Sequence, residues 1–92
     1  MPSTSDIQLH FKLTFFDRSF IRMVSKRGGE TSFDFGKVDE QLRRTCRERV
    51  ELMVRSGIFT MTPLIGTGGF LLRLTDVGTK LADQVNRVAE NV

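Results

Sequence analysis

The feature that most constrains the fold is the stretch from Val50 to Leu81, in which a helical pattern, two strand patterns and a second helical pattern follow one another. Gly57 ends the first helix, because a residue that adopts positive φ at little cost commonly follows a last helical turn. Residues 58–62 are mostly β-branched or aromatic, which favours a strand. Pro63 limits that strand or places it at a sheet edge, because it cannot donate to a ladder.

The second half of this stretch predicts a turn and the second strand of a hairpin. Residues 66–69, Gly-Thr-Gly-Gly, form a flexible tip. Phe70, Leu72 and Leu74 then alternate with their neighbours, as in a strand with one buried face. Thr75 or Asp76 caps the last helix, because a side-chain oxygen there accepts from an unpaired N–H of the first turn. The stretch is therefore predicted to form a helix end, a β-hairpin and a helix start.

This stretch resembles the end of the recognition helix and the wing of a winged helix-turn-helix domain of the MarR and PadR types. In those families a Val-x-x-Leu-x-x-x-Gly helix end precedes a hairpin, whose second strand runs into an R-L-T-x-x-G pattern. The resemblance implies an α+β fold with three or more helices and a small antiparallel sheet with a wing. It also implies a transcriptional regulator that binds double-stranded DNA. The matching residues are Val50, Met53, Gly57, Arg73, Leu74, Thr75 and Gly78.

The N-terminal part of the chain predicts a strand, a helix and a second strand. Apolar and polar residues alternate over residues 7–13, which favours an extra N-terminal strand that a winged helix does not require. Thr14 and Asp17 then have the spacing of a capping box, and apolar residues at helical spacing predict a helix over about residues 15–27. Alternation over residues 31–35 predicts another short strand. Residues 1–5 are expected to be disordered.

The segment from Lys37 to Ser56 contains neither Gly nor Pro, and two interpretations fit it. In the first, two helices meet at a tight turn near residues 39–41, as a helix-turn-helix requires. In the second, one long amphipathic helix spans the segment. The two-helix interpretation is preferred because it suits the wing that follows. The apolar stripe consists of Val38, Leu42, Cys46, Val50, Met53 and Val54.

The C-terminal segment predicts a helix over residues 76–90. Its apolar stripe contains Val77, Leu81, Val85 and Val88. Such a stripe requires cover. Either the helix packs on the first helix of its own chain, or it builds a homodimer, as in regulators that this chain resembles.

Length and composition limit the classes of protein to which this chain can belong. The 92 residues suit a single domain, and the net charge of +3 permits an anionic partner without requiring one. Cys46 is the only cysteine, which excludes an intramolecular disulfide and favours a reducing compartment. The polar start of the chain lacks the features of a secretory signal, and no apolar run has the length of a membrane span. A cytoplasmic protein is therefore predicted.

The sequence gives little sign of catalysis. His10 is the only histidine and falls on the polar side of the predicted strand, whereas Cys46 falls within the apolar stripe of a helix, with no histidine near it in sequence. Neither residue belongs to a metal-ligand pattern. We therefore expect no enzymatic activity, no catalytic residue, no metal and no cofactor.

The clearest indication of function in the sequence is a group of basic residues on one predicted helix. Arginine on the outward face of a helix can bind guanine through two hydrogen bonds or neutralise phosphate in the DNA major groove. Arg43, Arg44, Thr45 and Arg47 are predicted to enter that groove, and Lys26, Arg27 and Lys37 to hold phosphates. The wing tip carries no charge, so Thr67 and its neighbours would offer only backbone N–H groups.

An alternative function follows from the charges on the same helix. Arg44–Glu48, Arg47–Glu51 and Glu51–Arg55 are oppositely charged i, i+4 pairs, a pattern that stabilises a solvated helix. Two glutamates on that face also disfavour a phosphate backbone. The alternative is therefore a protein–protein interaction module on a winged-helix scaffold, with an exposed strand that pairs with a partner's sheet.

Overall fold

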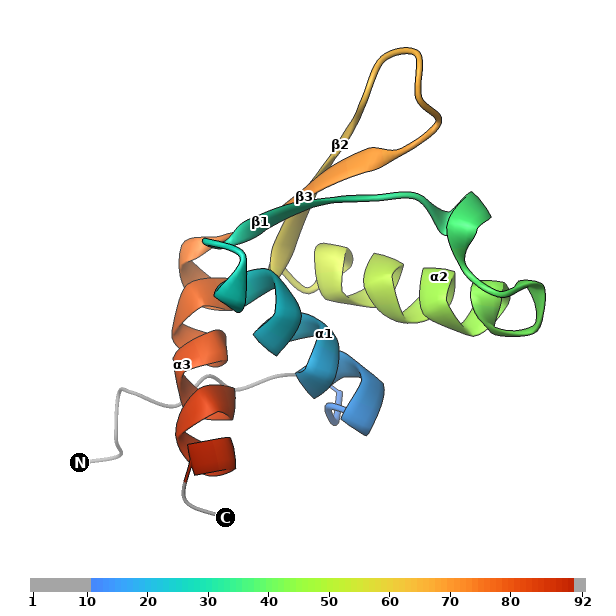
Figure 1. The fold of residues 1–92 in the computed structure, drawn as a ribbon. Helices are drawn as coiled ribbons and strands as arrows, with labels where there is room; N and C mark the ends of the chain where they lie inside the picture. Colours follow the sequence, from blue (N-terminus) through green and yellow to red (C-terminus); the bar gives the residue numbers. More distant parts are fainter. Residues whose placement is uncertain (1–10, 91–92) are drawn as a thin grey trace.

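The computed structural model describes the backbone of residues 11–90 and the side chains of residues 11–87 (Figure 1). Helix α1 (Phe15–Lys26) leads into strand β1 (Glu30–Phe33), and a short 3-10 turn, η1 (Phe35–Lys37), precedes helix α2 (Glu40–Arg55). Strands β2 (Phe59–Pro63) and β3 (Phe70–Leu74) form a hairpin, and helix α3 (Asp76–Glu90) completes the chain. The predicted α+β fold with three helices and a small antiparallel sheet is thus confirmed.

The sheet has the order β1-β3-β2, and both of its pairings are antiparallel. β3 is central, with Leu72 opposite Thr31 on β1 and Met61 on β2. Pro63 is the last residue of β2, at the edge of the sheet, where its missing N–H leaves no gap in the central ladder. Beyond the sheet, the hairpin projects as a free loop at the top of Figure 1.

The helix starts follow the predicted capping chemistry. At α1, the Thr14 Oγ1 accepts from the N–H of Asp17 at 3.2 Å, and the Asp17 carboxylate accepts from the N–H of Thr14 at 2.9 Å. At α3, the Thr75 Oγ1 accepts from the N–H of Gly78 at 2.9 Å. The capping box and the cap at Thr75 are therefore confirmed.

The preferred prediction of two helices between Lys37 and Ser56 is wrong. α2 is one uninterrupted helix, and the polar residues taken for a turn are its beginning. The Asp39 side chain accepts from the N–H of Gln41 at 2.9 Å, which is N-cap chemistry. The residues before it, Phe35–Lys37, make only a 3-10 turn in place of a preceding helix.

The predicted N-terminal strand is not found where it can be assessed. Residues 11–13 form no strand, and Phe11 and Leu13 instead pack against the core as the chain enters α1. Ile7–His10 lie outside the described residues. The next predicted strand is shorter than expected, because β1 ends at Phe33 and Phe35 begins the 3-10 turn.

The core lies between the sheet and the three helices. α1 contributes Phe20, which meets Phe33 and Phe59 edge-on with ring centroids 5.4 and 5.7 Å away. α3 packs along α1 and buries Leu81 and Val85, as one of the two predictions for this helix required. Val77, the first residue of the predicted apolar stripe of this helix, is exposed. Other core residues are Ile21, Val24, Cys46, Val50, Met53, Ile58, Leu72 and Ala82.

Within residues 11–90, no helix is both long and apolar enough to cross a membrane.

Candidate nucleic-acid interface

The inner face of α2 fixes which of its side chains point outward. Cys46, Val50 and Met53 are buried in the core, so the opposite side of the helix faces solvent. Arg44 lies on that opposite side, Thr45 and Arg47 lie on its two flanks, and all three are exposed. Leu42 is the exception in the predicted apolar stripe, because 62% of it is exposed.

Arg44 is the most accessible of these arginines. Its side chain is 91% exposed, and its Nε lies 3.3 Å from the Glu48 carboxylate. Such an exposed i, i+4 pair contributes only a few tenths of a kcal/mol, so a stronger acceptor can replace Glu48. Among the described side chains, this is the only one of the three predicted pairs within salt-bridge distance.

Arg47 and Arg43 both contact the 3-10 turn, but in different ways. The Arg47 guanidinium lies over the Phe35 ring, 5.0 Å from its centroid. Arg47 remains exposed in this position. The Arg43 guanidinium instead donates to three backbone carbonyls, those of Phe35, Gly36 and Val38, at 3.1, 3.3 and 3.3 Å. Arg43 thus holds the turn against α2, and three of its five N–H donors are occupied.

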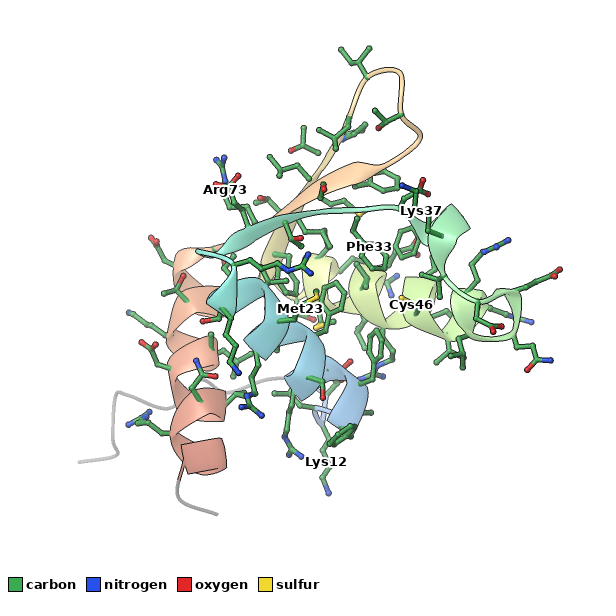
Figure 2. The ribbon with its side chains drawn as sticks, viewed as in Figure 1. Lys12, Met23, Phe33, Lys37, Cys46 and Arg73 are labelled. Carbon is green, nitrogen blue, oxygen red and sulfur yellow. The ribbon has the colours of Figure 1, made fainter. Side chains whose placement is uncertain are left out.

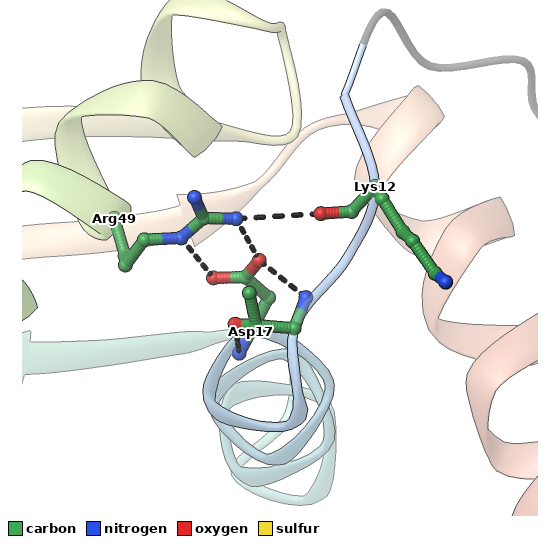
Figure 3. Close-up of polar contacts among 4 residues, drawn as sticks. Lys12, Asp17 and Arg49 are labelled. Atoms are coloured by element: carbon green, nitrogen blue, oxygen red, sulfur yellow. Dashed lines mark hydrogen bonds and ion pairs between the residues drawn. The ribbon is translucent and has the colours of Figure 1, made fainter.

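Arg49 makes the polar contact that sequence reasoning missed (Figure 3). Its Nε donates to Asp17 Oδ1 at 3.0 Å and its Nη2 donates to Asp17 Oδ2, so the two side chains form a bidentate ion pair between α2 and α1. The Nη2 also donates to the Lys12 carbonyl at 3.5 Å. The partners are 32 positions apart, and no local pattern relates them.

The pKa values of this pair follow from its surroundings. Burial alone would raise the pKa of Asp17, but hydrogen bonds from Arg49 and Thr14 and the Arg49 charge outweigh it and lower that pKa. The hydrogen bond to Asp17 likewise raises the pKa of Arg49. Both groups are therefore charged at neutral pH, and Arg49 is a structural arginine.

A shallow groove separates the hairpin from the 3-10 turn. Lys37 and Thr67, both predicted to contact DNA, line it from opposite sides together with Asp34 and Gly69, and Figure 2 shows Lys37 beside the hairpin. Lys37 is exposed. The Thr67 Oγ1 accepts from the N–H of Gly69 at 3.1 Å, which leaves that backbone donor engaged.

The remaining predicted phosphate contacts lie elsewhere. Lys26 and Arg27 stand at the end of α1 and line a hollow with Ser19, Arg22 and Met23. Lys26 is exposed, whereas the Arg27 Nη1 donates to the Thr31 Oγ1 at 2.9 Å. The structure therefore places these two cations at the C-terminal end of α1, apart from the groove that holds Lys37.

The outer face of α2 is electrically balanced. Its exposed cations are Arg44, Arg47 and Arg55, and its exposed anions are Glu40, Glu48 and Glu51. Arg44 and Arg47 lie in the N-terminal half of α2, beside the 3-10 turn that Arg43 holds and that carries Lys37.

Other chemistry finds little support among the described residues. Cys46 is buried, and burial raises the pKa of its thiol, so the thiolate is disfavoured. No group of three or more potential metal ligands occurs within the described part of the chain. His10 lies outside it.

Comparison with family models, curated proteins and solved structures finds no match for this chain.

Proposed function

We propose that this protein is a winged-helix DNA-binding protein that holds duplex DNA between the N-terminal half of α2 and the β2–β3 wing. The observation that carries the proposal is the exposure of Arg44, Thr45 and Arg47 on a helix that lies beside a projecting hairpin. Lys37 and Thr67 line the groove between that hairpin and the 3-10 turn that precedes α2. Transcriptional regulation in the cytoplasm, with no catalytic activity, is the role that suits this assignment.

In this arrangement Arg44 and Arg47 enter the major groove. Arg44 exchanges Glu48 for a guanine edge or a phosphate, because both accept bidentate hydrogen bonds from a guanidinium. Arg47 is held by the Phe35 ring, so its terminal nitrogens reach outward from a defined position. Lys37 neutralises a neighbouring phosphate. Arg43 acts indirectly, because it fixes the turn on which Phe35 and Lys37 lie.

The test is fluorescence anisotropy with a labelled duplex of mixed sequence at low and moderate salt. The variant Arg44→Ala/Arg47→Ala should bind at least about tenfold more weakly, since a bidentate base contact is worth about 1–3 kcal/mol. Lys80→Ala/Arg87→Ala is the matched control, because it removes two exposed cations from α3 and should keep wild-type affinity. Absence of binding at low salt, or equal affinity of the Arg44/Arg47 variant and the wild type, would overturn the proposal.

A second candidate is a protein-interaction module. It is favoured by the balanced charge of α2 and by two large exposed apolar side chains, Leu42 at 62% and Phe15 at 83%. The homodimer prediction belongs here. Because Leu81 and Val85 already pack inside the chain, a second copy would have to cover a surface such as Leu42. Sedimentation of the wild type and of Leu42→Ser tests this candidate: a dimer that Leu42→Ser disrupts would support it, and a monomer at all concentrations would contradict self-association.

A further inference from the structure

The outer face of α1 carries the densest unbalanced charge among the described residues. Asp17, Phe20, Ile21 and Val24 are buried, so they define the inner face of this helix. With 100° per residue, the opposite face holds one aromatic residue, one hydroxyl and three cations and no acid. These residues are Phe15, Arg18, Ser19, Arg22 and Lys26.

The three cations of this face, which we call the α1 basic stripe (Arg18, Arg22 and Lys26), stand at i, i+4 and i+8. Like charges at this spacing repel and destabilise a helix. The three salt bridges within residues 11–87 all involve other residues, so no described acid relieves the repulsion. Such an arrangement is unfavourable in the free protein and becomes favourable when an anion binds.

Arg22 is only partly exposed, and its contribution to this face is through the hollow that it lines. Its Nε is shielded from water and has no hydrogen-bond acceptor within the described structure. A buried donor on a cation is costly when unpaired. Arg22 also lines the hollow at the end of α1 with Lys26 and Arg27, where an incoming anion would meet all three cations.

We propose that the α1 basic stripe binds the sugar–phosphate backbone of nucleic acid and is the main source of sequence-independent affinity in this protein. This inference rests on the proposed function and assigns the phosphate contacts to a surface other than α2. The α2 face is charge-balanced, so it can select bases without contributing much to the attraction of phosphates. α1 supplies that attraction.

The geometry of the stripe suits a phosphate chain. Successive cations are separated by about 6 Å along the helix axis, at about 1.5 Å per residue. The stripe is thus about 12 Å long, which matches the rise of three to four nucleotides at about 3.4 Å each. The Ser19 hydroxyl lies on the same face as a neutral donor. An anionic membrane surface fits less well, because a membrane-bound helix also inserts an apolar face, and here only Phe15 is large, apolar and exposed.

The salt dependence of duplex binding tests this inference. The variant Arg18→Gln/Lys26→Gln removes two stripe cations and keeps Arg22, whose Nε is packed inside. Lys80→Gln/Arg87→Gln is the matched control, since both variants lower the net charge from +3 to +1. If two phosphate contacts are lost, the slope of log affinity against log salt should fall by about 1.8, so between about 50 and 200 mM salt the variant should lose about 12-fold less affinity than the wild type. The control should keep the wild-type slope.

The outcomes separate the two proposals. If the wild type binds duplex DNA but both variants keep its slope, the stripe is not the phosphate surface, although the α2 proposal stands. If both variants lose slope equally, net charge alone explains the effect and the inference is overturned. If the stripe variant keeps its slope for DNA but loses binding to vesicles containing phosphatidylserine, the partner is a membrane and the inference is again overturned. Urea unfolding checks the fold, because removal of repelling charges should leave the unfolding midpoint unchanged or slightly raised.

Discussion

The Asp17–Arg49 ion pair should be the most consequential polar contact in the protein. The Asp17 side chain is fully buried and that of Arg49 is 24% exposed, so little water competes for either charge. In Asp17→Asn, an amide replaces the carboxylate. Its oxygen can still accept one hydrogen bond, but its NH2 group then faces the donors of Arg49 and Thr14.

The expected loss is large for a domain of this size. Removing one partner of a buried ion pair costs about 3–5 kcal/mol when the other charge stays buried without compensation, and the 24% exposure of Arg49 places the expected loss at the lower end of this range. A domain such as this is stable by about 5–15 kcal/mol in total. With a urea m-value of about 1.5 kcal/mol/M, a loss of 3 kcal/mol lowers the unfolding midpoint by about 2 M. The capping box of α1 is damaged by the same change, which adds to the loss.

Urea unfolding followed by circular dichroism measures this effect. Arg44→Ala is the control, because it breaks an ion pair whose side chains are 91% and 65% exposed and should cost less than about 0.5 kcal/mol. The double variant Asp17→Asn/Arg49→Gln should lose less than the sum of the two single losses, since neither leaves the other unpaired. The reasoning is refuted if Asp17→Asn unfolds at the same urea concentration as Arg44→Ala.

The same pair sets the acid response of the fold. Despite the opposing effect of burial, contacts with Arg49 and Thr14 lower the pKa of Asp17 below its ordinary value of 3.8. A group whose pKa is lowered by folding contributes stability above its unfolded pKa and loses it as the pH falls through the folded pKa. The stability difference between wild type and Asp17→Asn should therefore be constant near neutral pH and shrink below pH 3.8. A difference that persists unchanged into strong acid would contradict this.

Three further predictions concern packing. Gly78→Ala should destabilise by more than about 1 kcal/mol, because a Cβ there would lie 2.0 Å from the Ile58 carbonyl oxygen, and a thermal melt would show it. Phe59→Ala should cost about 3–5 kcal/mol in urea unfolding, whereas Phe15→Ala, at an 83% exposed position, should cost less than about 0.5 kcal/mol. Cys46 should react with iodoacetamide much more slowly in native protein than in urea, because burial raises the pKa of its thiol; equal rates would place it at the surface.

Local chemistry explains what the sequence predicted correctly. Thr14 and Thr75 cap helices through partners three residues away, and Gly57 takes a φ of +83° after α2, which only a residue without a Cβ adopts cheaply. The strand alternation around Leu72 identifies a buried face because its period is two residues. Each of these signals lies within a few positions along the chain.

Long-range contacts explain what the sequence did not predict. Asp39 has the same polar character in a turn as at an N-cap, so sequence alone left the number of helices open. Leu42 belongs to the apolar stripe but is exposed, whereas Cys46, one turn later, is covered. The carbonyl contacts of Arg43 and the ion pair of Arg49 depend on how α2 meets residues before it in the chain. These contacts make Arg43 and Arg49 structural residues of α2.

Three of the residues that carry the winged-helix resemblance, Gly57, Thr75 and Gly78, meet at a joint around Ile58. The Thr75 hydroxyl donates to the Ile58 carbonyl at 3.2 Å, and its N–H donates to the same carbonyl at 3.1 Å. The Gly57 carbonyl shares the same hydroxyl proton, and Gly78 packs against Ile58 with no space for a side chain. This joint ties the start of α3 to the end of α2.

None of these joint residues lies on either proposed DNA surface, so the R-L-T-x-x-G pattern supports an architecture and carries no information about a ligand. What the protein binds must follow from the outward charges that the joint leaves free. Those charges differ between the helices: they are balanced on α2 and uniformly positive on α1. Under the proposal made above, a chain with the same joint but acids in the α1 stripe should keep the fold and bind phosphate weakly. We therefore expect the charge of α1, more than the resemblance, to determine how strongly this protein attracts phosphate.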